Sequence, residues 1–71
     1  MKDKNWKLLK FRTKLGLTQE EVALKMGFKF LTYHRVENGE TKGSMEFWKR
    51  FKDVFQISDA EIWYFMNNEE N

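Results

Sequence analysis

Several residue types that small proteins use for chemistry are missing or scarce in this sequence of 71 residues. It contains no cysteine and a single histidine, His34. The first absence excludes a disulfide framework and a thiolate nucleophile. A structural zinc site needs about four nitrogen or sulfur ligands, which one histidine cannot supply. No Ser–His arrangement or glycine-rich phosphate loop replaces these groups. We therefore predict no enzymatic activity, no catalytic or metal-binding residues, no cofactor and no small-molecule substrate.

Long hydrophobic stretches are also absent. No run approaches the about 20 apolar residues that a membrane-spanning helix needs. Residues 1–5 contain lysines but are not followed by the apolar core of a signal peptide. With no cysteine, the composition is also compatible with a reducing compartment. We expect a cytoplasmic protein with no membrane partner.

Aromatic residues are abundant by contrast, with seven Phe, three Trp and two Tyr. A chain of this length forms one small domain, and such a domain without disulfides or metal needs an unusually well-packed core. Aromatic packing is the obvious source of that stability. We assign residues 1–66 to a single domain and residues 67–71 to a short disordered tail.

Helical spacing of apolar residues predicts five helices, at residues 4–15, 19–26, 30–38, 45–55 and 59–66. Thr18 and Glu21 form a potential capping box at the start of the second helix, and Ser58 and Glu61 do so at the fifth. Gly27 follows the second helix, where a residue that tolerates positive φ is favoured. No strand-like alternation is present, so the predicted fold is all-α.

Charge is unevenly distributed along the chain. Residues 1–35 contain nine cations and three anions, a net charge of +6, whereas residues 36–71 contain four cations and eight anions, a net charge of −4. This asymmetry suits a nucleic-acid-binding face on the N-terminal half. A solvated lysine-rich helix is the alternative explanation.

Two short helices that meet at a glycine have the plan of a helix-turn-helix. The segment at 16–23, Met26-Gly27 and the segment at 36–39 together resemble the Cro/CI (XRE-type, lambda-repressor-like) family of small phage and mobile-element regulators. The resemblance covers residues 8–62. It implies a compact five-helix lambda-repressor-like domain, with the helix-turn-helix at helices two and three.

The resemblance also implies roles for individual residues. Gln19 occupies the position that contacts a DNA phosphate, and Asn38, with Lys42 nearby, corresponds to a residue that often touches the DNA backbone. Arg12 and Glu37 correspond to a buried or half-buried structural ion pair.

The start of the third helix departs from the family pattern, because Lys29, Phe30 and Leu31 stand where a Ser or Thr cap and polar base-contacting residues are usual. Lysine cannot accept an amide hydrogen bond, so we expect no side-chain cap. Phe30 and Leu31 cannot distinguish purines by bidentate contacts, although either could touch a thymine methyl group. The complete set of candidate DNA-binding residues is Gln19, Lys29, Thr32, His34, Arg35, Asn38 and Lys42.

Two functions follow from these features. The first is a small transcriptional regulator of the Cro or phage-repressor kind that binds operator DNA as a homodimer. The alternative is a modulator or antirepressor that binds a partner repressor protein and alters its DNA occupancy, with an antitoxin as a minor variant. The candidate partner-binding residues are Phe28, Phe30, Leu31, His34, Trp63, Tyr64 and Phe65, of which the last three must lie partly in the core.

Overall fold

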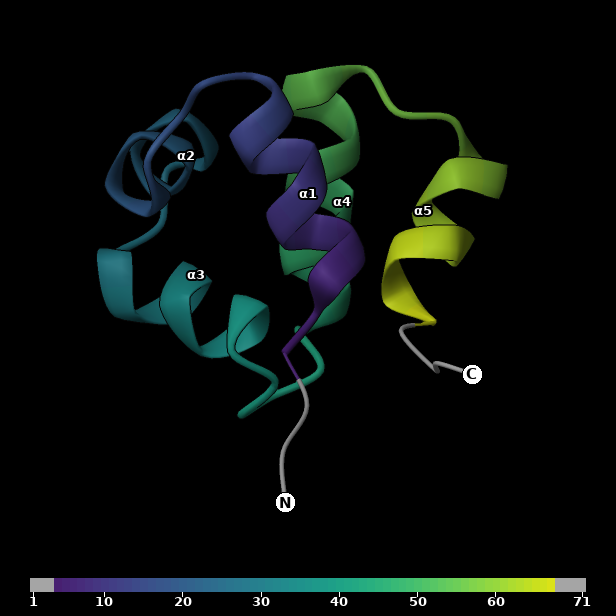
Figure 1. The fold of residues 1–71 in the computed structure, drawn as a ribbon. Helices are drawn as coiled ribbons and strands as arrows, with labels where there is room; N and C mark the ends of the chain where they lie inside the picture. Colours follow the sequence, from purple (N-terminus) through teal and green to yellow (C-terminus); the bar gives the residue numbers. More distant parts are fainter. Residues whose placement is uncertain (1–3, 68–71) are drawn as a thin grey trace.

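The computed structural model describes residues 4–67 and consists, over that range, of five α-helices and their connections (Figure 1). They are α1 (Trp6–Lys14), α2 (Gln19–Met26), α3 (Phe30–Glu37), α4 (Met45–Phe55) and α5 (Asp59–Met66). In Figure 1, α1 runs through the middle of the molecule, with α2 and α3 on one side and α5 on the other. The predicted all-α, five-helix fold is confirmed.

The first helix begins two residues later than predicted because Asn5 caps it. The Asn5 side-chain oxygen accepts a hydrogen bond from the Leu8 amide at 3.0 Å. Asn5 is buried, its side-chain amide donates to the Phe65 carbonyl at 3.0 Å, and its backbone N–H donates to the Glu37 carbonyl at 2.8 Å. This one residue therefore ties the start of α1 to the ends of α3 and α5.

The other helix starts follow the local signals in the sequence. Both predicted capping boxes form, at α2 and at α5, and Ser44 accepts from the Phe47 amide at the start of α4. Lys29 makes no side-chain cap at α3, as expected. α3 ends at Glu37, one residue before the predicted end, because Asn38 has left the helical backbone region.

The core is built largely from aromatic rings. Phe11 of α1 meets Phe51, Phe55 and Phe65 edge to face, with ring centroids 5.3–5.4 Å apart. Such contacts stabilise beyond the burial of apolar area. Phe65 is only 7% exposed, so its prediction as a partner-binding residue is wrong. Its helical phase turns it into this ring cluster.

Phe28 is also directed inward. Its ring is half-buried, stacks on the Phe47 ring at a centroid distance of 5.7 Å and carries the Arg50 guanidinium over it at 4.8 Å. Little of Phe28 is thus left for a partner protein.

The predicted tail at residues 67–71 lies outside the described residues except for Asn67. That residue is held in place, because its N–H donates to the Trp63 carbonyl at 3.0 Å and its own carbonyl accepts from Lys7 Nζ at 2.8 Å. Among residues 4–67, none of the helices has the length and apolar character needed to cross a membrane.

Candidate nucleic-acid interface

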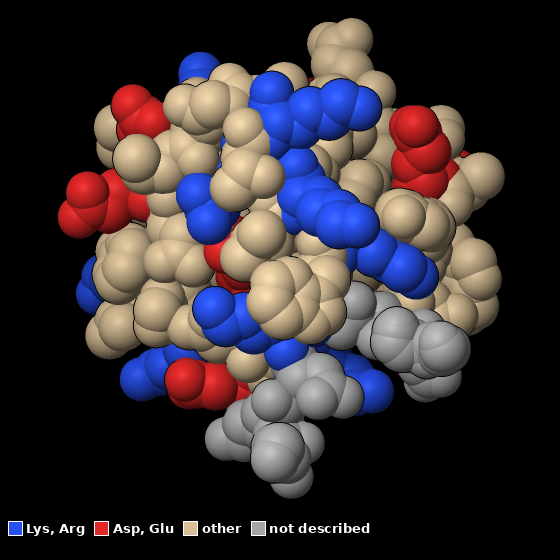
Figure 2. Space-filling model, viewed as in Figure 1, with Lys and Arg blue, Asp and Glu red and all other residues tan. Residues whose placement is uncertain are grey.

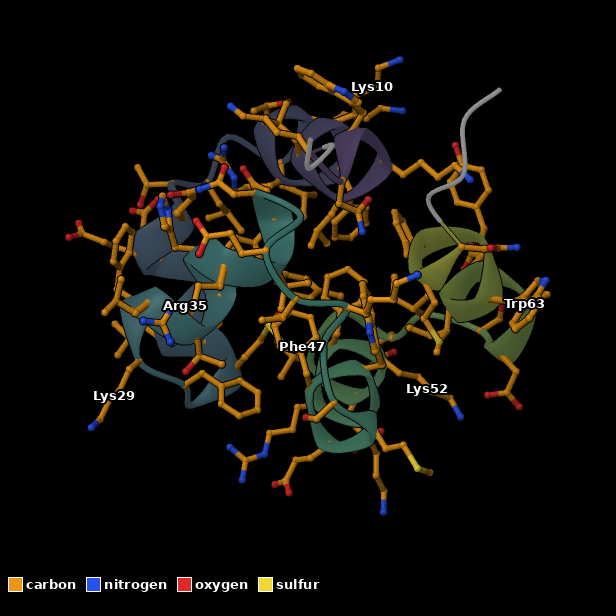
Figure 3. The ribbon with its side chains drawn as sticks, turned by 90° about the horizontal axis from the view of Figure 1, so that it is seen from below. Lys10, Lys29, Arg35, Phe47, Lys52 and Trp63 are labelled. Carbon is orange, nitrogen blue, oxygen red and sulfur yellow. The ribbon has the colours of Figure 1, made fainter. Side chains whose placement is uncertain are left out.

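The exposed face of α3 is defined by the residues that the helix buries. Tyr33, Val36 and Glu37 point into the molecule. At 100° per residue, Leu31 and Arg35 therefore lie at the centre of the outer face. In Figure 3, Lys29 and Arg35 point away from the interior, in which Phe47 lies. In DNA-binding helix-turn-helix proteins, the exposed face of the second helix of the motif enters the major groove.

A buried carboxylate lies directly beneath this face. Glu37 is 1% exposed and accepts two hydrogen bonds from Arg12, from Nε at 2.8 Å and Nη2 at 2.9 Å. It also accepts from the Tyr33 hydroxyl at 2.6 Å and from Gln19 Nε2 at 2.9 Å. The structure thus contains the ion pair implied by the family resemblance. Together, these hydrogen bonds connect α1, α2 and α3 at the carboxylate of Glu37.

These hydrogen bonds determine the charge state of the cluster. Burial by itself would raise the pKa of Glu37, but hydrogen bonds from Arg12, Tyr33 and Gln19 outweigh burial and hold that pKa below its usual value. The hydrogen bond to Glu37 raises the pKa of Arg12, and burial raises the pKa of Tyr33. Glu37 is therefore an anion, and Tyr33 remains a neutral donor.

Three of the predicted DNA-binding residues form a chain that starts at this carboxylate. Gln19 Oε1 lies 3.0 Å from His34 Nδ1, and Asn38 Nδ2 lies 2.8 Å from His34 Nε2. Because Gln19 Oε1 can only accept, its hydrogen bond with His34 requires a proton on Nδ1. Asn38 Nδ2 also lies 3.3 Å from Nδ1, so it contacts both nitrogens of the imidazole ring. Glu37 takes one of the two N–H bonds of the Gln19 amide. The other is available to an external acceptor such as a phosphate oxygen.

The other four predicted DNA-binding residues are cationic or hydroxylic and exposed: Lys29, Thr32, Arg35 and Lys42. Thr32, Arg35 and Lys42 line a shared hollow between α3 and the loop that leads to α4. Gln19, His34 and Asn38 are therefore joined by their contacts, and Thr32, Arg35 and Lys42 are joined by the hollow, whereas Lys29 lies apart from both sets at the start of α3.

Positive charge extends beyond α3. Figure 2 shows Lys and Arg side chains across the middle of the molecular face on which α1 lies, with Asp and Glu mostly nearer its rim. The first turn of α2 carries Glu20 and Glu21, which oppose the attraction of its helix terminus for anions. Attraction for a phosphate therefore depends on the neighbouring cations and on the Gln19 amide.

The remaining partner-binding candidates lie on two different surfaces. Phe30 and Leu31 are 39% and 52% exposed on α3, whereas Trp63 and Tyr64 are 65% and 55% exposed on α5. Figure 3 places Trp63 at the opposite edge of the molecule from Lys29 and Arg35. The two exposed pairs cannot form one continuous patch.

The connections between these residues were not predicted from the sequence. Gln19, His34 and Asn38 were predicted as separate contact residues, and Glu37 was paired with Arg12 alone. Asn5 was also missed, although an asparagine before an apolar helical pattern is a cap signal. Within residues 4–67, no three His, Asp or Glu side chains gather in a way that could hold a metal ion.

Comparison with known proteins agrees with this geometry. Residues 8–62 match the helix-turn-helix family HTH_3. A protein of Archaeoglobus fulgidus named as an uncharacterized HTH-type transcriptional regulator is 34% identical over 65 residues, which covers 80% of this chain and 93% of that protein. No solved structure shows a significant match. The chain belongs to the lambda-repressor-like (XRE-type) helix-turn-helix family of transcriptional regulators.

Proposed function

We propose that this protein is a repressor of the Cro or phage-repressor kind that binds operator DNA through α2 and α3. The observation that carries the proposal is the chain of hydrogen bonds from Glu37 through Gln19 and His34 to Asn38. It fixes polar side chains at the edge of the exposed face of α3 before any ligand arrives. Such preorganisation lowers the entropy lost on binding.

The candidate residues take two different roles in this proposal. Gln19, Asn38, Lys29 and Lys42 contact phosphates, which set affinity and register but read no sequence. Arg35, at the centre of the outer face, reads a base edge, because its guanidinium matches the O6 and N7 acceptors of guanine. Thr32 and His34 contact bases or phosphates beside it.

The functional unit in this proposal is a homodimer. One recognition helix reads only a few base pairs, and two copies on paired half-sites supply the remaining specificity. Trp63 and Tyr64 are the candidate dimer surface, because they are large, exposed and lie away from α3.

Selection from a random duplex library, followed by titration of the enriched duplex, tests this function. A dimer that neutralises about six to eight phosphates should show log affinity falling with log salt at a slope near −5 to −7. Lys42→Ala should reduce that slope by about one per lost phosphate contact. Lys49→Ala removes another exposed cation, from α4, and should leave the slope unchanged. No enriched sequence, or equal effects of the two variants, would contradict the proposal.

A second function, modulation of a partner repressor protein, is favoured by one observation. Phe30 and Leu31 expose apolar surface on the helix that would otherwise read bases. If they anchor a protein partner, Phe30→Ala should leave DNA binding intact while it weakens binding to that repressor. Loss of DNA binding by a folded Phe30→Ala protein would argue against this function.

A further inference from the structure

We propose that Phe30 and Leu31 read the 5-methyl group of thymine, so that each operator half-site carries thymine opposite the first turn of α3. This inference rests on the proposed DNA binding and specifies the sequence that it selects. Both residues belong to the first turn of the recognition helix, whose N-terminal residues contact base edges in the major groove.

The two side chains lie where base edges would come. Leu31 lies at the centre of the outer face of α3, one turn before Arg35. Phe30 lies on the side toward α2 and lines a hollow together with Thr18 and Gln19. A duplex that rests a phosphate on Gln19 and aligns its groove with Arg35 therefore brings base edges against Phe30 and Leu31.

Phe30 is held in position before binding. Its ring stacks on the His34 ring with a centroid distance of 5.1 Å and an interplanar angle of 25°. His34 is itself fixed between Gln19 and Asn38. The aromatic surface is thus preorganised, and little side-chain freedom is lost when a base packs against it.

The surroundings favour DNA over a protein as the occupant. Because Phe28 packs inward, only Phe30 and Leu31 remain in this patch. They expose on the order of 150 Å² together, less than the about 300–600 Å² of the largest apolar patch on a typical monomer. The exposed neighbours Lys29 and Arg35 are cations, which complement phosphate.

Thymine is the base that such a surface recognises. Its methyl group is the one apolar group that the four bases present in the major groove. Adenine, guanine and cytosine would place hydrogen-bonding groups against side chains that can neither donate nor accept, and an unpaired buried polar group is unfavourable. Phe30 and Leu31 therefore select thymine by burying its methyl group and by disfavouring the alternatives.

Deoxyuridine substitution tests this reading, because it removes only the methyl group. The probe is the duplex enriched from the random library, with each thymine replaced in turn by deoxyuridine and bound to the full chain. At one or two positions in each half-site we expect affinity to fall about fourfold, the effect of about one buried methyl group. 5-Bromodeoxyuridine, which restores the volume of the methyl group, should recover most of the loss.

Protein variants assign the effect to the two side chains. In Phe30→Ala or Leu31→Ala, the corresponding deoxyuridine substitution should no longer weaken binding. Leu24→Ala, which alters an apolar side chain of α2 that is 79% exposed, should retain full sensitivity. Circular dichroism verifies folding, and the measurements on the unaltered protein do not depend on any variant.

The outcomes separate this inference from the proposed function. An enriched duplex that binds equally well with deoxyuridine at every position overturns thymine reading and leaves operator binding intact. Sensitivity that persists unchanged in both variants also overturns it. If the library yields no enriched sequence, operator binding and thymine reading both fail, and a protein partner becomes the better occupant of the patch.

Discussion

Replacing Glu37 by alanine should remove a large part of the stability of this domain, although it removes a single side chain from the end of a short helix. Glu37 accepts four hydrogen bonds from three residues: Arg12, Tyr33 and Gln19. In Glu37→Ala the Tyr33 hydroxyl, on a side chain with no exposed surface, loses its acceptor. Arg12, with its side chain 15% exposed, keeps only its hydrogen bond to the Leu17 carbonyl.

The magnitude follows from those losses. An unsatisfied buried donor costs about 1–3 kcal/mol, and breaking a buried ion pair by removing one partner costs about 3–5 kcal/mol. A domain of this size has a total unfolding free energy of about 4–10 kcal/mol. We expect Glu37→Ala to lower it by about 3–5 kcal/mol, and Glu37→Gln, which retains the shape and some acceptor capacity, to lower it by less.

Urea denaturation at pH 7, followed by the far-ultraviolet circular dichroism of the helices, measures this difference. Glu40→Ala is the matched control, because Glu40 is exposed and lies beyond the end of α3; its effect should stay within about 0.5 kcal/mol. If Glu37→Ala costs no more than Glu40→Ala at an unchanged denaturant dependence, the buried carboxylate does not stabilise the fold and our reasoning is wrong.

Three further predictions concern stability. Hydrogen bonds hold the pKa of Glu37 in the folded protein below the about 4.3 of an unfolded chain, so its stabilising effect is complete above a pH of about 4.3 and is lost as the pH falls through the pKa of the folded protein. The difference in unfolding free energy between the wild type and Glu37→Gln should therefore shrink in acid. A constant difference from pH 7 to pH 3 would contradict this prediction. Lys29→Ser should raise the unfolding free energy by about 0.5–1 kcal/mol, because serine supplies the side-chain cap that α3 lacks. Ser44→Ala, which removes the cap of α4, should lower the unfolding free energy by about 1 kcal/mol. If Lys29→Ser gives no gain in thermal stability, the backbone amides at the start of α3 already have hydrogen-bond partners. Gln56 follows α4 with a φ of +56°, a left-handed backbone conformation that favours glycine. Gln56→Gly should therefore raise the unfolding free energy by up to about 1 kcal/mol. A lower melting temperature would indicate that the glutamine side chain stabilises the protein by more than the backbone strain costs.

The parts of the fold that were predictable depend on neighbours in the sequence. Thr18, Ser44 and Ser58 cap helices through residues three positions away, so a short window contains the whole interaction. The absence of a cap at Lys29 follows from the chemistry of one side chain. Helical periodicity alone did not predict the first residue of α1 correctly. That helix is capped by Asn5, whose other hydrogen-bond partners come from α3 and α5.

The connections within the candidate site depend on packing and were not predictable. Gln19 and Glu37 are separated by 18 positions, and the hydrogen bond between them exists because α2 and α3 pack at one particular angle. Phe65 is a further example, since sequence patterns cannot decide which side of a short aromatic run faces the core. The family resemblance supplied the Arg12–Glu37 pair, but not the chain of contacts that links it to Asn38.

The Asn5 contacts join the two ends of the chain and have a consequence for folding kinetics. The hydrogen bond from Asn5 to Phe65 spans 60 positions, so it closes only after α5 has docked. Contacts that form after the transition state affect the unfolding rate far more than the folding rate. Asn5 also donates to the last carbonyl of α3. Opening of α5 should therefore loosen the end of α3, and if the chain binds DNA through α3 as proposed, DNA should also slow hydrogen exchange at the amides of α5.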